Sequence, residues 1–137
     1  MKILIDTNII IDVLEKRIPF FEDSYKVIQM GTQEKLDAFI SAGAVTDVYY
    51  VIKRSIGDAN KAKEKIIALI SLVNICDTTT ADINLALTLG ISDFEDAVVS
   101  AIAKREKADY IISRSEADFK NSPVPVISPG QFLRQFY

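Results

Sequence analysis

KILIDTNIII, residues 2–11, joins a short apolar run to one carboxylate and then continues into a second apolar run. An uninterrupted apolar run of this length is typical of a parallel strand that is buried on both faces. We therefore predict a strand over residues 2–6 and a helix after it. A buried carboxylate lowers stability unless it is paired, so Asp6 at the end of this strand is expected to serve a function.

The remainder of the chain alternates between helical and strand-like patterns. Capping-box pairs are expected to open three of the helices, at Thr79 with Asp82, Ser92 with Glu95 and Ser128 with Gln131. No hairpin signal such as Asn-Gly occurs, so we predict an α/β fold with a mostly parallel sheet between helical layers, in a single domain over residues 1–137. The predicted strands lie at 36–43, 73–76, 108–113 and 124–128, and the predicted helices at 18–36, 45–55, 57–73, 79–90, 92–107 and 129–137.

The composition restricts the class of protein. The 16 Lys and Arg residues against 19 Asp and Glu give a net charge of −3, so no overall positive field attracts a polyanion. Nucleic-acid binding would depend on a local basic patch or on metal ions. Cys76 is the single cysteine, which excludes an intramolecular disulfide and fits a reducing compartment. With no apolar run near the roughly 20 residues of a membrane span and no signal-peptide pattern, we expect a cytoplasmic protein.

Acidic residues recur just after the predicted strands. Asp6 ends the first strand, Asp47 follows the second, and Asp118 lies a few residues beyond a later one. Asp93 and Asp96 lie in the first turns of one predicted helix, on the same face. Ligands of an open parallel sheet bind beyond the carboxyl ends of its strands, so these five acids are predicted to meet at one edge.

A cluster of this kind has a definite chemistry. Carboxylates gathered closely repel one another and raise each other's pKa unless cations bind them. Hard oxygen ligands favour Mg²⁺ or Mn²⁺, and two such ions can activate a water and stabilise the leaving oxygen of a phosphodiester. The chain contains no histidine, which argues against a zinc hydrolase and excludes a histidine-based triad. The sequence thus predicts an acidic metal site for phosphodiester hydrolysis.

Each candidate also has a purely structural interpretation. Asp93 would stabilise a helix N-terminus electrostatically, Asp47 and Asp118 would be solvated surface carboxylates, and Asn8 would be a helix N-cap. Asp6 has few such alternatives, because it lies at the end of a buried strand. Two further acids are interpreted as the polar face of the first helix, namely Asp12 and Glu15.

Basic residues form two groups along the predicted helices. Either group could bind phosphates, although such runs are more often solvated helix faces. Arg114, at the end of a predicted strand and near Asp118, is a better candidate to bind a phosphate or a carboxylate. The two groups are Lys53, Arg54, Lys61, Lys63 and Lys65, and Lys104, Arg105 and Lys107.

Three segments together carry a family resemblance over essentially the whole chain. ILIDTNIIIDVL (residues 3–14), DFEDAVVSAIA (93–103) and ADYIISRSEADF (108–119) resemble, in order and spacing, the motifs of PIN-domain proteins. The resemblance implies an α/β/α sandwich around a parallel sheet, an acidic pocket for Mg²⁺ or Mn²⁺, and ribonuclease activity on single-stranded RNA. Many small PIN proteins are VapC-type toxins, usually homodimeric and inhibited by an antitoxin protein.

The resemblance also assigns roles by position. Asp6 matches the first family acid, Asp96 the third and Asp118 the fourth, and Asn8 matches the polar residue that orients the first acid. The second acid is commonly Glu, and Asp47 is its nearest match. Its side chain is one methylene shorter, so it would hold a metal through water or reach the site less well. The implied metal ligands are Asp6, Asp47, Asp96 and Asp118.

Two other functions are compatible with the same residues. A haloacid-dehalogenase-like phosphatase also carries an Asp at the end of its first strand, but it needs a second Asp two positions on, where this chain has Asn8. A PIN-like module that binds RNA or a protein without cleavage is favoured by Asp47 in place of Glu. The retained acids argue against it, since a pure binding surface gains little from gathering like charges. A milder departure is Arg114-Ser115, where relatives often have Arg-Asn.

The C-terminal segment offers a surface for self-association. Its three aromatic side chains would pack in a dimer interface, although packing of the last helix on the core explains them equally well. They are Phe132, Phe136 and Tyr137.

Overall fold

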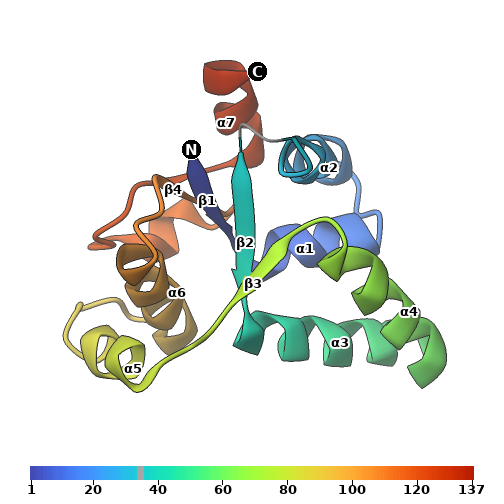
Figure 1. Ribbon diagram of the computed structural model, residues 1–137, viewed down its shortest axis with the longest axis horizontal. Coiled ribbons are helices and arrows are strands. Elements are labelled where there is room, and N and C mark those ends of the chain that lie inside the picture. Colours follow the sequence, from blue (N-terminus) through green and yellow to red (C-terminus); the bar gives the residue numbers. More distant parts are fainter. Residues whose placement is uncertain (34–35) are drawn as a thin grey trace.

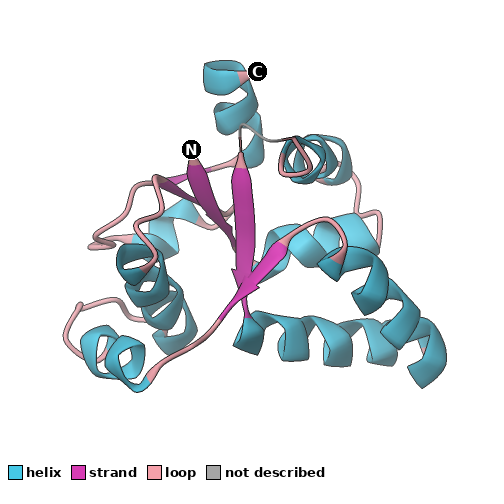
Figure 2. Ribbon diagram, in the orientation of Figure 1, coloured by secondary structure: helices cyan, strands magenta, loops and turns pink. Residues whose placement is uncertain are grey.

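The computed structural model describes residues 1–33 and 36–137 and contains a central sheet whose strands all run parallel (Figures 1 and 2). The strand order is β3-β2-β1-β4-β5, which places the first strand in the middle of the sheet. The parallel α/β fold predicted from the sequence is confirmed. The strands of this sheet are β1 (Lys2–Ile5), β2 (Asp37–Ser41), β3 (Asn74–Cys76), β4 (Tyr110–Ile112) and β5 (Val126–Ile127).

Helices cover both faces of the sheet. Figure 1 shows α5 and α6 on one side, and α1, α2, α3 and α4 on the other. Two separate groups of buried side chains lie between the sheet and these layers. The helices are α1 (Thr7–Leu14), α2 (Phe21–Met30), α3 (Ala42–Ile56), α4 (Ala59–Ile70), α5 (Thr80–Ala86), α6 (Phe94–Arg105) and α7 (Pro129–Phe136), and a 3-10 helix, η1, spans Glu116–Phe119.

The central strand explains the continuous apolar run at the start of the chain. Ile3 and Ile5 pack into the core beneath α1 and α3, while Leu4 points to the other face and packs with Phe39 and Ile111. Successive side chains of a strand alternate between faces, and here both faces are covered. Every side chain of β1 after Lys2 is therefore buried, and an apolar residue is required at each position.

Some predicted boundaries were wrong. The helix expected at 18–36 is shorter, since α2 spans Phe21–Met30, and residues 34–35 of that prediction lie outside the described part of the chain. The helix expected from residue 45 begins at Ala42, because the Ser41 hydroxyl accepts a hydrogen bond from the Ala44 backbone and caps it.

The predicted capping boxes had different outcomes. Those at Thr79 and Ser128 are present, with reciprocal side-chain bonds to Asp82 and Gln131. The box expected at Ser92 with Glu95 is wrong, because the N-cap of α6 is the next residue, Asp93. This shift leaves the Glu95 side chain free of a capping role.

Two general expectations can be compared with the structure. Over the described residues, no helix combines the length and the apolar character needed to cross a membrane. Cys76 is a free, half-buried thiol at the end of β3, and burial raises its pKa to about 11. A thiol with so high a pKa is protonated at neutral pH and is a weak nucleophile.

Candidate active site

Asp6 lies at the carboxyl end of the central strand, between β1 and α1. It is 7% exposed, and burial raises the pKa of its carboxyl group. The Thr7 backbone donates to Asp6 Oδ1 at 2.8 Å, and the Ser113 hydroxyl donates to Asp6 Oδ2 at 2.7 Å. Asp6 is thus the N-cap of α1, which corrects the N-cap interpretation of Asn8, and both of its oxygens are held in place.

Ser113 joins three segments around Asp6. Its Oγ also accepts a hydrogen bond from the Ser115 backbone at 3.1 Å and lies 3.4 Å from Asn8 Nδ2, which donates in addition to Ser115 Oγ at 3.2 Å. The Asn8 Oδ1 atom is buried and has no hydrogen-bond partner among the described residues. A buried acceptor without a partner is costly, so Asn8 has an oxygen available to a ligand or a water.

The two acids at the start of α6 differ in role. Asp93 is the N-cap of the helix, because its Oδ1 accepts a 3.0 Å hydrogen bond from the Asp96 backbone, whereas its structural interpretation placed it in the first turn as a favourable charge. Asp96 is partly buried in the first turn, and its pKa is raised to about 7 by burial and then by the negative charges of Asp6, Asp93, Asp118 and Glu95. These acids therefore lie close enough to act on one another electrostatically.

Asp47 lies near Glu95, a residue to which the sequence analysis assigned only a capping role. Asp47 is exposed in the first half of α3, and Glu95 lines the same pocket. Burial, a hydrogen bond with Asp47 and the charge of Asp47 raise the pKa of Glu95. Asp47 and Glu95 therefore form a second acidic pair beside Asp6 and Asp96.

Asp118 approaches the same edge from the loop after β4. It lies in η1 and is exposed. Its charge contributes to the raised pKa of Asp96, so the two carboxyl groups lie within electrostatic range of each other. Exposure at this position agrees with the solvated interpretation, and the proximity to Asp96 agrees with the predicted acidic edge.

The interpretation of Asp12 as part of a polar helix face was wrong. Its side chain is fully buried, and Arg114 donates to it twice, from Nε to Oδ2 at 2.6 Å and from Nη2 to Oδ1 at 3.2 Å. The Arg114 guanidinium also lies over the Phe20 ring, 4.3 Å from its centroid. Arg114 was expected to bind a phosphate or a carboxylate, and in the structure it binds the carboxylate of Asp12. Glu15 is the partly exposed C-cap residue that follows α1, and it pairs with Arg17 at 2.8 Å.

Several basic residues that were candidates for phosphate binding have protein partners instead. Arg105 donates to Asp82 at 2.9 Å, to the Asp77 carbonyl at 2.6 Å and to Glu106 at 2.9 Å. Lys65 donates to the Leu14 carbonyl at 3.0 Å. Arg105 therefore stabilises the contact between α5 and α6 and is not available as a phosphate ligand.

The acidic residues can be assessed as ligands for a metal ion. Carboxylate oxygens are the donors that Mg²⁺ and Mn²⁺ prefer, and the raised pKa of Asp96 reflects like charges that a cation would offset. Across residues 1–33 and 36–137, no three or more His, Cys, Asp or Glu side chains are arranged so that they could hold a metal ion. The residues therefore fit such an ion in charge and donor type, and not in a ready-made coordination geometry.

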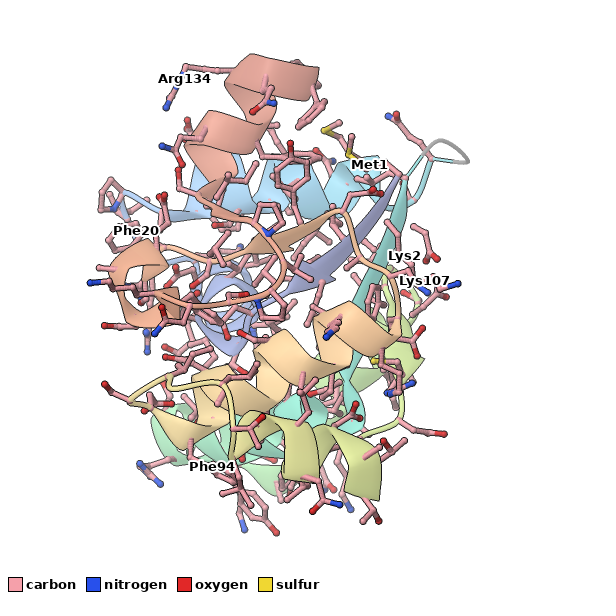
Figure 3. All side chains as sticks on the ribbon, turned by 90° about the vertical axis from the view of Figure 1, so that its left-hand side faces the viewer. Met1, Lys2, Phe20, Phe94, Lys107 and Arg134 are labelled. Atoms are coloured by element: carbon pink, nitrogen blue, oxygen red, sulfur yellow. The ribbon has the colours of Figure 1, made fainter. Side chains whose placement is uncertain are left out.

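A pocket of about 320 Å³ opens beside the acids, between the first turns of α3 and α6. Thr7, Ser41 and Val98 line it, together with Asp47 and Glu95 at its acidic side. Phe94 also lines this pocket and is 50% exposed. Figure 3 shows Phe94 at the end of the molecule remote from Met1 and Arg134.

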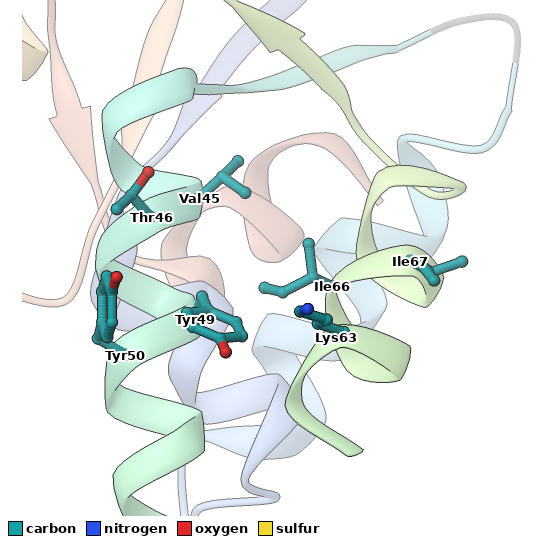
Figure 4. A pocket seen from close by; sticks show the side chains of 7 residues that line it. All are labelled: Val45, Thr46, Tyr49, Tyr50, Lys63, Ile66 and Ile67. Carbon is teal, nitrogen blue, oxygen red and sulfur yellow. The ribbon is translucent and has the colours of Figure 1, made fainter. Parts of the chain in front are cut away.

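A second hollow, the α3–α4 groove, lies between these two helices (Figure 4). It has a volume of about 460 Å³. Figure 4 shows Val45 and Tyr49 of α3 facing Ile66 and Lys63 of α4. Tyr50 and Ile67 extend the lining, and they are 56% and 64% exposed.

Sequence interpretation missed three residues at this edge. Ser113 follows β4, the strand beside β1, so the same strand-end rule that selected Asp6 could have found it. Glu95 was hidden by the misplaced capping box. Only one sequence feature could have marked Phe94 as a site residue. It is a large aromatic residue at an expected helix N-terminus, between two acids.

Comparison with known proteins adds to this geometry. The family model described as "PIN domain" matches residues 2–117. The chain is 25% identical to "Ribonuclease VapC1" of Aquifex aeolicus (strain VF5) over 140 residues, which cover 98% of this chain and 95% of that protein.

Solved structures have the same fold. A chain of VapBC2 from Rickettsia felis, bound to a DNA fragment from its promoter, matches with a TM-score of 0.75 and 17% identity over 93% of this chain and 98% of that chain. A chain of a toxin-antitoxin complex from Klebsiella pneumoniae matches with a TM-score of 0.69 and 22% identity, over 92% and 96% of the two chains.

Proposed function

We propose a function for this chain, which belongs to the PIN-domain family. It is a metal-dependent endoribonuclease that acts on single-stranded or loop RNA. The observation that carries the proposal is the acidic edge, where burial and the charges of Asp6, Asp93 and Asp118 raise the pKa of Asp96 to about 7. Perturbed carboxyl groups gathered at the carboxyl ends of strands are typical of catalytic sites. The similarity to a protein named as a ribonuclease supports the same chemistry.

Asp6, Asp47, Asp96 and Asp118 would hold the ion, which we expect to be Mg²⁺ or Mn²⁺. When bound, a divalent ion of this kind lowers the pKa of a water and stabilises the leaving oxygen of a phosphodiester. Asp93 completes the set of candidate catalytic acids, and its bond to the Asp96 backbone fixes the first turn of α6. The number of ions depends on whether the short side chain of Asp47 reaches the site.

The chain's own residues orient the ligands. The Ser113 hydroxyl and the Thr7 backbone hold the two Asp6 oxygens, and Asn8 holds Ser113 and Ser115 in turn. The unpartnered Asn8 Oδ1 would accept a hydrogen bond from a water at the site. Arg114 is engaged by Asp12, so we assign it a positioning role in place of substrate-phosphate binding.

Protein partners are part of the proposal. The R. felis and K. pneumoniae chains come from a VapBC2 complex and a toxin-antitoxin complex, which supports a toxin role with a cognate antitoxin. The α3–α4 groove, with Tyr50 and Ile67 exposed beside it, is the surface where we expect an apolar antitoxin segment to bind. For a homodimer, Phe136 and Tyr137 remain candidates at 37% and 83% exposed, whereas Phe132 is fully buried in the core.

Cleavage of an end-labelled RNA pool tests the function. The full chain would be incubated with Mn²⁺, with Mg²⁺ and with EDTA, beside Asp6→Asn. We expect cuts that require the metal and vanish in this variant. Glu22→Gln is the matched control, because it removes one exposed negative charge on α2 and should leave cleavage unchanged. Cleavage by Asp6→Asn at the wild-type rate would contradict the proposed site.

A module that binds RNA or a protein without cleavage is the second candidate. Two observations favour it, namely the pairing of Asp47 with Glu95 and the lack of a ready-made metal geometry among the described residues. The melting temperature in Mn²⁺ separates the candidates. A rise for wild type that Asp6→Asn lacks supports the metal-dependent enzyme, whereas no response together with no cleavage supports the binding module.

A further inference from the structure

The pocket between α3 and α6 is continuous with the acidic edge, and of its lining residues the proposed chemistry uses only Asp47 and the backbone of Thr7. Thr7, which lines the pocket, directly follows Asp6 in the chain. Glu95 lines it as well, and it directly precedes Asp96 in the first turn of α6. A nucleotide whose phosphate lies at Asp6 would therefore have a neighbouring base within reach of this pocket.

Phe94 at the pocket is poorly explained by folding alone. It occupies the first position of α6, it is 50% exposed, and acids lie on both sides of it in the chain. Phe is a modest helix former, and a half-exposed ring leaves much of its apolar area in water. A flat aromatic face that is open to solvent beside a nuclease site is suited to stacking with a base.

The lining favours a base over a phosphate. Asp47 and Glu95 at the pocket would repel a phosphate, whereas carboxyl oxygens accept hydrogen bonds from the amino and ring N–H groups of a base. Thr7, Thr78 and Val98 complete a wall that is mostly apolar, which suits the flat faces of a base. A volume of about 320 Å³ is at the lower end of the roughly 300–1,000 Å³ of small-molecule pockets, which suits one base.

We propose that this pocket, with Phe94 as its stacking surface, binds the nucleobase next to the scissile phosphate of the RNA. The assignment rests on the ribonuclease function proposed above and adds a substrate subsite to it. Discrimination among bases would come from the carboxyl groups, which accept hydrogen bonds from bases that present an amino group.

A cycle between protein and substrate variants tests the subsite. The full chain and Phe94→Ala would be compared on one single-stranded oligoribonucleotide and on copies with an abasic nucleotide at each position in turn. Both kcat/KM and the binding affinity of the labelled RNA would be measured. Loss of base stacking, about 1–3 kcal/mol, corresponds to about 5- to 150-fold, so we expect Phe94→Ala to lose this factor on the intact RNA. At one position adjacent to the cut, the abasic substrate should show the same loss of kcat/KM and of binding affinity with the wild-type protein. On that substrate Phe94→Ala should cause no further loss.

Two variants control for other effects. Phe94→Tyr keeps the ring and should retain the wild-type preference. Tyr25→Ala removes an aromatic side chain that is 38% exposed on α2, across the sheet from α6 (Figure 1), and it should behave as wild type.

The outcomes separate the subsite from the nuclease. If the RNA is cleaved and Phe94→Ala lowers kcat/KM equally on every abasic substrate, or on none of them, the subsite is overturned. The proposed nuclease function is then retained. A position-specific coupling in binding without any cleavage shows a base-binding pocket at Phe94, rejects the nuclease and overturns the assignment of that base to a scissile phosphate. Absence of both RNA binding and cleavage overturns the subsite together with the proposed function.

Discussion

Arg114 and Asp12 are separated by 102 residues in the chain and form a two-point contact, with Nε–Oδ2 at 2.6 Å and Nη2–Oδ1 at 3.2 Å. The contact ties α1, which follows Asp6, to the loop that carries Ser113 and Asp118. Arginine and carboxylate groups form such bidentate pairs with defined geometry. The pair therefore sets the relative position of two segments that both contribute to the acidic edge.

Asp12→Asn should destabilise the fold and weaken the site. The variant leaves the Arg114 guanidinium without its charge partner, and the loss of a charged hydrogen bond costs about 1–3 kcal/mol. Urea denaturation at constant m-value measures this change. Arg17→Ala is the control, since Arg17 lies 3.9 Å from Asp12 and is 42% exposed, and it should cost less than about 1 kcal/mol. Equal stability of Asp12→Asn and wild type would show that the pair is not structural.

Ser113→Ala should reduce RNA cleavage more than it reduces stability. The variant removes the 2.7 Å bond to Asp6 and the acceptor of the Ser115 backbone, which we expect to cost about 1–2 kcal/mol of folding free energy. The Asp6 carboxylate would then be held by the Thr7 backbone alone, so kcat should fall by at least about tenfold in the metal-dependent assay.

Ser115→Ala is the comparison for this prediction. It removes only the 3.2 Å bond from Asn8 and should have the smaller effect on kcat. If Ser115→Ala lowered kcat more than Ser113→Ala, the role assigned to Ser113 would be rejected.

Arg105→Gln should lower stability without changing cleavage. Arg105 bonds to Asp82, the buried capping residue of α5, and to the Asp77 carbonyl. It is 33% exposed, so solvent screening limits the expected cost to about 1 kcal/mol. Thermal denaturation and the RNA assay, run on the same preparation, check both halves. A loss of RNA cleavage in a folded variant would restore Arg105 as a candidate phosphate ligand.

The sequence predicted the elements better than their partners. The apolar run of β1 is unambiguous because both faces of the sheet are covered, and the acids at strand ends follow from the parallel topology. Asp12 could not be recognised as buried, since its partner Arg114 lies 102 residues away and helical spacing alone places it on a polar face.

A similar limit applies to α6. Ser92 and Asp93 are both good N-caps, and only the backbone selects Asp93. The choice determines whether Glu95 closes a capping box or faces Asp47. A shift of one residue in a helix start thus changed the predicted composition of the site.

The pH dependence of metal-free stability provides the last prediction. Asp96 has an ordinary pKa of 3.8 in the unfolded chain and a pKa of about 7 in the fold. Between these values the folded protein holds a proton that the unfolded chain has released, so the free energy of unfolding falls as the pH rises from about 4 to about 7. Asp96→Asn lacks this proton, and its melting temperature in EDTA should decline less over the same interval and exceed that of wild type at pH 8. Mn²⁺ should raise the wild-type melting temperature most at the alkaline end, because a metal ion competes with protons for the carboxylates. A wild-type melting temperature in EDTA that rose from pH 4 to pH 7 by the same amount as that of Asp96→Asn would show that the acids do not repel one another in the fold.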